Sequence, residues 1–177
     1  MKKLRKKEEF IRTFTGKNFH IFNPQEEELG IRDISHSLSL QCRFNGHTKC
    51  FYSVGSHSLI GAELITQKFK KEFLCHENAE VIIGDLVTPI KRQSPEFLKI
   101  EKRIEKVLTK KYGLPYPMSK EVKEMDNLMF RMEFVYLMGA KNETNEKFPL
   151  TKKEFMKEVC KTPQEVEREF LKTFNQL

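Results

Sequence analysis

One apolar segment of the chain carries charged side chains where a buried helix is expected. Residues 74–85 read LCHENAEVIIGD, so His76, Glu77 and Glu80 lie among leucine, cysteine, alanine, valine and isoleucine. Side chains three and four positions apart share one face of a helix, which places these polar groups along one edge. Charged groups inside a core must be paired, bound to a metal or exposed to water. Other parts of the chain must therefore supply their partners.

The remaining sequence predicts an all-α protein. Apolar residues recur at helical spacing in several segments, which we expect as helices over Asp33 to about Cys42, 56–69, 71–83, 95–112, 119–138 and two final pieces separated at Thr162-Pro163. The strand signal is thin, and the first 30 residues predict a short hairpin or an irregular arm. We see no repeat and no linker, so residues 1–177 are expected to form one domain.

Composition limits the partners and the compartment. The formal net charge of +7 and the pI near 9.2 indicate an acidic partner, either nucleic acid or a phosphate-bearing small molecule, or simply a solvated basic surface. No apolar run approaches the roughly 20 residues of a membrane span, so no membrane partner is expected. The basic opening MKKLRKK lacks a following signal-peptide core, and the four cysteines form no CxxC pair. These features predict a cytoplasmic protein with reduced thiols.

Two further polar residues, His57 and Asp126, lie in apolar helical patterns. Two histidines and two carboxylates from separate helices can form the ligand shell of a divalent transition metal, with positions left for water and substrate. Simpler interpretations exist for both residues. His57 can cap its helix or lie at the surface, and Asp126 can pair with Arg131 or Lys123 on the solvent side. Spacing alone leaves the choice open, because no HExxH motif is present.

A set of short motifs in a fixed order carries a resemblance to a known family. They are SVGSHS at 53–58, HENAE at 76–80, GDL at 84–86, TPIK at 88–91 and finally Asp126. This set resembles the HD-domain metal-dependent phosphohydrolases, in particular bacterial HD-domain 5'-deoxynucleotidases and phage-type HD proteins that include dATP triphosphohydrolases. The resemblance to the phage-type proteins also includes the motifs DISHSLS at 33–39 and RFNGHT at 43–48. The resemblance covers roughly residues 14–138 and implies a single HD-type helical bundle.

The resemblance implies a ligand set for one divalent transition metal, namely Co, Mn, Zn or Fe. The matching positions are His57, His76, Glu77 and Asp126. Magnesium on the nucleotide phosphates is a further option. One position departs from the family pattern, because its name-giving pair is His-Asp and this chain has His76-Glu77. The glutamate keeps the carboxylate on a side chain that is one methylene longer, so metal placement and catalysis both depend on how Glu77 is held.

The same resemblance implies roles for the residues around the metal. Glu80 matches the family's general acid or base, and Asp85 matches the residue near the sugar 3'-hydroxyl. Arg43 matches the phosphate-side arginine, and its neighbour Phe44 matches an aromatic residue that flanks the base or the sugar. Lys91 matches a lysine that reaches the phosphates.

Together these features predict a hydrolase that acts on deoxynucleotides by attack of a metal-activated water on phosphorus. The excess of lysine and arginine favours a dNTP triphosphohydrolase of the dATP type, and the alternative is a 5'-deoxynucleotidase that releases phosphate from dNMPs. A non-catalytic nucleotide-binding or sequestering protein is the rival from another class, because of Glu77. Nucleic acid is not expected as the primary partner, since the basic face between Lys99 and Lys110 lacks interleaved aromatic residues. The resemblance also implies a homo-oligomer, in the host cytoplasm if the chain is phage-encoded.

Overall fold

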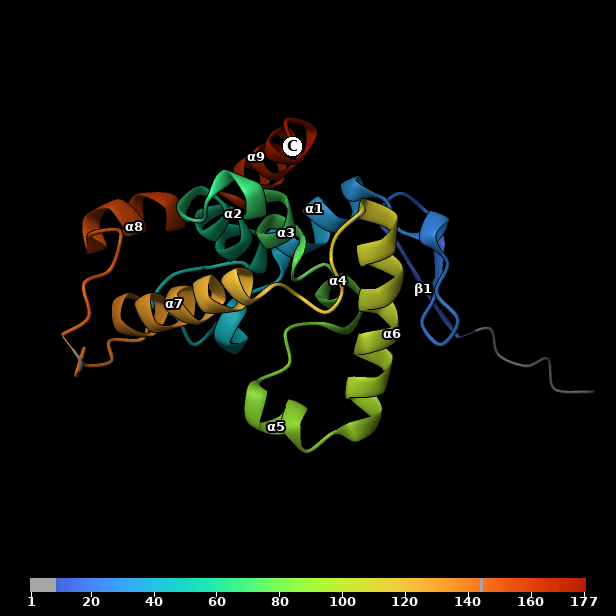
Figure 1. Ribbon diagram of the computed structural model, residues 1–177, viewed down its shortest axis with the longest axis horizontal. Helices are drawn as coiled ribbons and strands as arrows, with labels where there is room; N and C mark the ends of the chain where they lie inside the picture. Colours follow the sequence, from blue (N-terminus) through green and yellow to red (C-terminus); the bar gives the residue numbers. More distant parts are fainter. Residues whose placement is uncertain (1–8, 144) are drawn as a thin grey trace, which may run out of the picture.

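The computed structural model describes residues 9–143 and 145–177, which form a helical body with one short hairpin (Figure 1). The hairpin pairs β1 (Phe10–Arg12) with β2 (Asn18–His20) in antiparallel register. The helices follow as η1 (Glu26–Glu28), α1 (Ile31–Leu40), η2 (Arg43–Gly46), α2 (Val54–Leu64), η3 (Gln67–Phe69), α3 (Lys70–Cys75), α4 (Glu80–Ile83), α5 (Thr88–Arg92), α6 (Pro95–Tyr112), α7 (Lys120–Tyr136), α8 (Lys152–Val159) and α9 (Pro163–Asn175). The prediction of an all-α fold with a short N-terminal hairpin is confirmed.

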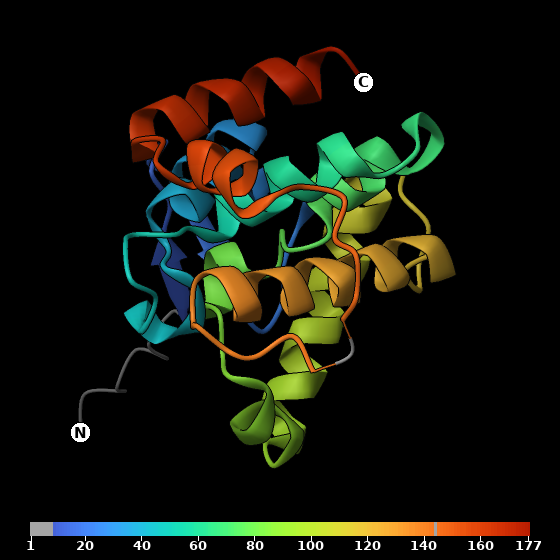
Figure 2. The same ribbon diagram turned by 90° about the vertical axis from the view of Figure 1, so that its left-hand side faces the viewer.

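Helix α2 lies at the centre of this body. Every residue from Val54 to Ala62 is buried, as expected for a helix that is apolar or small on all sides. Helices α1, α3, α7, α8 and α9 all contact α2, and α9 runs along the outer edge of the body (Figure 2). Gly61 allows the closest approach, because a Cβ there would overlap the ring of Phe73 in α3. This packing holds the end of α3 against the second turn of α2.

Helix α6 stands beside the body, with α5 packed against it at its far end (Figure 1). Its buried stripe includes Ile104 and Leu108, whereas most of its basic residues are exposed or half-buried. Gly113 ends the helix in the left-handed conformation, at φ 65°. The bounds of α6 agree with the prediction, whereas α5 was not predicted. In the described part of the chain, no helix combines the length and apolar character needed to cross a bilayer.

The segment predicted as one helix over 71–83 is divided in two. Helix α3 ends at Cys75, residues 76–79 form a turn, and α4 begins at Glu80. Within the turn, the N–H groups of Asn78 and Glu80 donate to carbonyls only three residues back, which is tighter than an α-helix. The predicted stop at Gly84 is confirmed, with φ 77° at that residue. The polar edge predicted from helical spacing is therefore presented by a turn between two helices.

Helix starts also differ from the sequence prediction by a few residues. Helix α2 begins at Val54 because the Ser53 hydroxyl accepts the N–H of Ser56. Helix α1 begins at Ile31, so Asp33 lies inside its first turn and accepts the N–H of Gly30 there. The cap predicted at Thr162 is confirmed, since its hydroxyl accepts the N–H of the third helical residue. The hydroxyl caps at Ser53 and Thr162 determine where α2 and α9 start.

Candidate metal centre and active site

Four side chains from three separate segments converge beside α2. His57 comes from α2, His76 and Glu77 from the turn after α3, and Asp126 from α7. One nitrogen or oxygen atom of each lies within 4.8 Å of the corresponding atom of every other. The structure thus brings together the four residues that the sequence predicted as metal ligands. Their binding of a metal stays a prediction.

Both imidazoles are held with their Nε2 atoms facing the cluster. The Nδ1–H of His57 donates to Glu133 Oε1 over 2.6 Å, and the Nδ1–H of His76 donates to the carbonyl of Phe73 over 2.5 Å. The two Nε2 atoms are 3.3 Å apart. In the neutral rings both of these nitrogens carry lone pairs, so a proton or a metal cation is needed between them.

The spacing of the four donor atoms fits a single ion. Two ligands that lie about 2.0–2.2 Å from one ion are about 2.8–3.6 Å apart in octahedral or tetrahedral geometry. The Asp126 carboxylate lies 3.2 Å from Nε2 of His57 and 3.6 Å from Nε2 of His76. The Glu77 carboxylate lies 3.4 Å from Nε2 of His76. These three distances and the 3.3 Å between the two Nε2 atoms lie in that range, and the second nitrogen of each ring is already hydrogen-bonded, as in ligating histidines.

The electrostatics of the cluster also favour a cation. Burial opposes protonation of His76, but the carboxylates of Glu77 and Asp126 raise its pKa to about 10. Burial likewise opposes protonation of His57, yet Glu133 and Asp126 raise its pKa above the ordinary value. Burial acts against ionisation of Asp126, but its hydrogen bonds with the two imidazoles hold its pKa below the usual range. The site therefore attracts positive charge, which a metal would supply in place of the protons.

A buried network that the sequence did not predict lies behind the metal cluster. Glu133 of α7 accepts hydrogen bonds from His57, from the Tyr52 hydroxyl at 2.7 Å and from Arg43 at 3.2 Å. Burial acts to raise the pKa of Glu133, but Arg43 and His57 lower it below its usual range. Arg43 also reaches the Glu77 carboxylate at 3.3 Å. The predicted phosphate-side arginine is thus engaged with two carboxylates.

A cavity of about 460 Å³ opens beside the cluster. Most of the predicted site residues line it, namely Arg43, His76, Glu77, Glu80, Asp85, Lys91 and Asp126. His57 lies beneath this lining and is fully buried. The Phe44 ring lies outside the lining, stacked 6.0 Å from Phe130, which does line the cavity. The fold therefore gathers the predicted catalytic and substrate residues around one space next to the four donors.

Glu80 is one of two buried acids that line this cavity, and the other, Glu101, is paired with Lys91. The Glu80 side chain is only 6% exposed, and its Oε2 has no hydrogen-bond partner among the described residues. Burial, with further contributions from Glu77 and Asp85, raises its pKa well above the ordinary value. Such a shift favours the protonated carboxyl group, which is the form that can donate a proton to a developing anion.

Two other predicted residues of the cavity, Asp85 and Lys91, are also tied to neighbours. Burial raises the pKa of Asp85, while the N–H of Phe44 donates to its carboxylate and acts in the opposite direction. The Lys91 ammonium group lies 2.5 Å from the Glu101 carboxylate. Burial acts to lower the pKa of Lys91, but this partner raises it, so the lysine stays charged.

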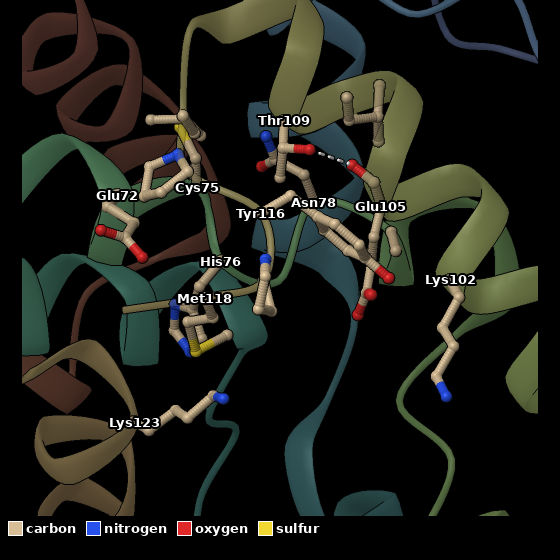
Figure 3. Close-up of a pocket in the computed structure, with 15 residues that line it drawn as sticks. Glu72, Cys75, His76, Asn78, Lys102, Glu105, Thr109, Tyr116, Met118 and Lys123 are labelled. Carbon is tan, nitrogen blue, oxygen red and sulfur yellow. Dashed lines mark hydrogen bonds between the residues drawn. The ribbon is translucent and has the colours of Figure 1, made fainter. Parts of the chain in front are cut away.

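Figure 3 shows a second cavity, of about 260 Å³. It adjoins the first cavity, and both are lined by His76, Ala79, Glu105 and Met118. Its walls are mostly apolar, with leucine and proline from the segment that follows α6. The buried Asn78 amide also lines it. Among the predicted site residues, only His76 reaches this second space. The acid–base groups are therefore concentrated in the first cavity.

The helical fold is that of the HD-domain class of metal-dependent phosphohydrolases, and the cluster differs from the His-Asp pattern of that class by the glutamate at position 77. Residues 48–132 match the family model described as 5'-deoxynucleotidase YfbR-like, a stretch that contains the four candidate ligands together with Glu80, Asp85 and Lys91. The chain is 40% identical to the uncharacterized protein YfdR of Escherichia coli K12 over 124 residues, which is 70% of each chain. It belongs to the YfbR-like family.

A second relative is the uncharacterized protein RCAP_rcc00048 of Rhodobacter capsulatus. It is 28% identical over 142 residues, which is 72% of each chain. Arg43 and Phe44 precede the stretch matched by the family model. The family match therefore includes the candidate ligands but does not include these two predicted substrate contacts.

Proposed function

We propose that this protein is a divalent-metal-dependent 5'-deoxynucleotidase, which hydrolyses a deoxynucleoside 5'-monophosphate to a deoxynucleoside and inorganic phosphate. The observation that carries the proposal is the convergence of four donor atoms within 4.8 Å beside a cavity that is lined by the buried carboxyl group of Glu80. Membership of the YfbR-like family supports the same reaction class.

His57, His76, Glu77 and Asp126 would hold the ion, which we expect to be Mn, Co, Zn or Fe. When bound, such an ion lowers the pKa of a water molecule and offsets the negative charge of a phosphate. Asp126 and Glu77 each contribute one negative charge, so the ligand set itself leaves a divalent ion neutral overall. The phosphate then binds without opposition from excess negative charge among the ligands.

Glu80 would serve as the proton donor in this reaction. Hydrolysis forms a bond from water oxygen to phosphorus and breaks the bond from phosphorus to the 5'-oxygen of the sugar. The leaving 5'-oxygen needs a proton, which Glu80 would donate, since burial raises its pKa and favours the protonated form. The proton that the attacking water loses would restore the acid. Asp85, positioned by the N–H of Phe44, would accept a hydrogen bond from a sugar hydroxyl at the same cavity.

Charge in the cavity favours the monophosphate over the triphosphate. The predicted preference for a dNTP depended on the excess of lysine and arginine in the whole chain. In the cavity, however, the acidic side chains outnumber the Lys and Arg cations even when the proton donor Glu80 is left out. The other acids are Glu77, Asp85, Glu101, Glu105 and Asp126, and the cations are Arg43, Lys91 and Arg92. Arg43 and Lys91 are also paired with glutamates. A doubly charged phosphate beside one metal suits this balance better than a triphosphate does.

The test is chromatographic product analysis with all dNMPs and dNTPs in the presence of Mn²⁺, Co²⁺ or Zn²⁺. The proposal predicts a deoxynucleoside and phosphate from dNMPs. Release of inorganic triphosphate from dNTPs would replace the nucleotidase with a triphosphohydrolase. Saturable nucleotide binding without any product would favour a sequestering protein instead.

A further inference from the structure

We infer that Glu133 is a positioning residue that holds two of the four candidate metal ligands, His57 directly and Glu77 through Arg43. The inference rests on the proposed metal centre and extends it to residues that lie behind the ligands. It also gives Arg43 a different role from the phosphate contact that the sequence predicted.

Glu133 is fully buried, and both of its carboxylate oxygens are engaged. Oε1 accepts the Nδ1–H of His57 at 2.6 Å and the Tyr52 hydroxyl at 2.7 Å, and Oε2 accepts an N–H of Arg43 at 3.2 Å. Three donors around one buried carboxylate fix its position, because its rotation would leave polar groups unpaired in the core.

The bond to His57 acts on the candidate metal ligand itself. A carboxylate that accepts the Nδ1–H fixes the tautomer with a lone pair on Nε2 and makes the ring a better electron donor. It also fixes the plane of the ring, which a metal ligand requires. Asp126 and Glu133 are seven residues apart on α7, which is two helical turns, so both lie on the face of α7 directed to α2. One helix therefore supplies a ligand and the support for a second ligand.

Arg43 extends this support to Glu77. One guanidinium nitrogen lies 3.3 Å from the Glu77 carboxylate and the other lies 3.2 Å from the Glu133 carboxylate. The planar guanidinium is rigid, so the two carboxylates are held at a fixed separation. The longer glutamate side chain at position 77 has more rotamers than an aspartate, and this contact restricts them. Arg43 also balances charge, because Glu77 and Glu133 share its one positive charge inside the protein.

The decisive comparison is between Glu133→Gln and a matched control, Glu72→Gln. Glu72 is another buried glutamate, whose carboxylate accepts two hydrogen bonds from Ser119 and, among the described residues, forms no hydrogen bond or ion pair with the four candidate ligands. Metal dissociation constants are measured by chelator competition on folded protein, with circular dichroism to confirm folding. We expect Glu133→Gln to weaken Mn²⁺ or Zn²⁺ binding by about ten- to a hundredfold and Glu72→Gln to leave it within about twofold.

A second measurement does not depend on the stability of any variant. In zinc-loaded wild-type protein, nitrogen-15 NMR should show an Nδ1-protonated, Nε2-ligated His57 whose Nδ1 proton resonates far downfield, as expected for a short bond to a carboxylate. A His57 ring without that proton would overturn the inference, and so would Glu133→Gln protein that binds metal as tightly as the wild type. Wild-type protein that binds no metal at all would instead refute the proposed function.

Discussion

Replacing Glu80 by glutamine tests the proposed proton donor and has a second, independent consequence for stability. The amide keeps the size of the side chain but cannot release a proton to the leaving 5'-oxygen. Loss of a positioned general acid typically slows a reaction about 10²–10⁴-fold, which corresponds to about 2.7–5.5 kcal/mol in the activation free energy. We expect kcat for phosphate release to fall by this factor while the bound metal per chain is unchanged.

Although Glu80→Gln should lower the activity, it should raise the free energy of unfolding at alkaline pH. Burial raises the folded-state pKa of Glu80 above its ordinary value of 4.5. The protonated side chain therefore makes its full contribution to the free energy of unfolding below about pH 4.5. It is lost as the pH rises through the folded-state value, where the buried group must ionise. Glutamine avoids this loss. The free energy of unfolding of Glu80→Gln should therefore equal that of the wild type near pH 4.5 and exceed it at alkaline pH.

Phosphate release and urea unfolding across this pH range measure both effects on the same samples. Glu121→Gln is a suitable control, because Glu121 lies exposed in the first turn of α7. Turnover of Glu80→Gln within about tenfold of the wild type would refute the proton-donor role. Lower stability of the variant at alkaline pH would refute the argument from burial.

Three further predictions concern the candidate metal ligands and the hairpin. Asp126→Asn removes the carboxylate between the two imidazoles, so metal affinity should fall by at least about tenfold in chelator competition. In the wild type, the same assay should show an affinity that rises with pH up to about pH 10, because the metal competes with the proton of His76, whose pKa is raised to about 10. Asp33→Ala should lower the free energy of unfolding by about 1–3 kcal/mol near pH 7, because the N–H groups of Thr15 and Gly30 lose their acceptor. Burial acts to raise the pKa of Asp33 but these bonds hold it below 3.8, so the difference should vanish in urea unfolding as the pH falls through that lowered value.

The four candidate ligands could be predicted because each stands out from its local pattern. His57 and Asp126 interrupt apolar helical runs, and the motif order links them to His76 and Glu77. Long helices with caps and stops, such as α6 between Ser94-Pro95 and Gly113, were also predicted within a few residues. These features depend on residues that are close together in the sequence, so they can be predicted without knowledge of tertiary contacts.

The supporting network could not be predicted in the same way. Glu133 lies in the sequence FRMEFVY, where a glutamate on a helix normally faces water, and nothing local indicates that it is buried. Its three partners are 76, 81 and 90 residues away in sequence. The break after Cys75 was missed for a related reason, because the apolar pattern continues through the turn while the chain tightens to present His76 and Glu77.

The proposed deoxynucleotide phosphohydrolase activity requires a single divalent ion bound by the four converging side chains. The most direct test is a titration of chelator-treated protein with Mn²⁺ in which bound metal and phosphate release from a dNMP are measured together. We expect both to rise in parallel and to saturate at one ion per chain. Full phosphate release without bound metal, or saturation with metal and no release from any deoxynucleotide, would contradict this assignment.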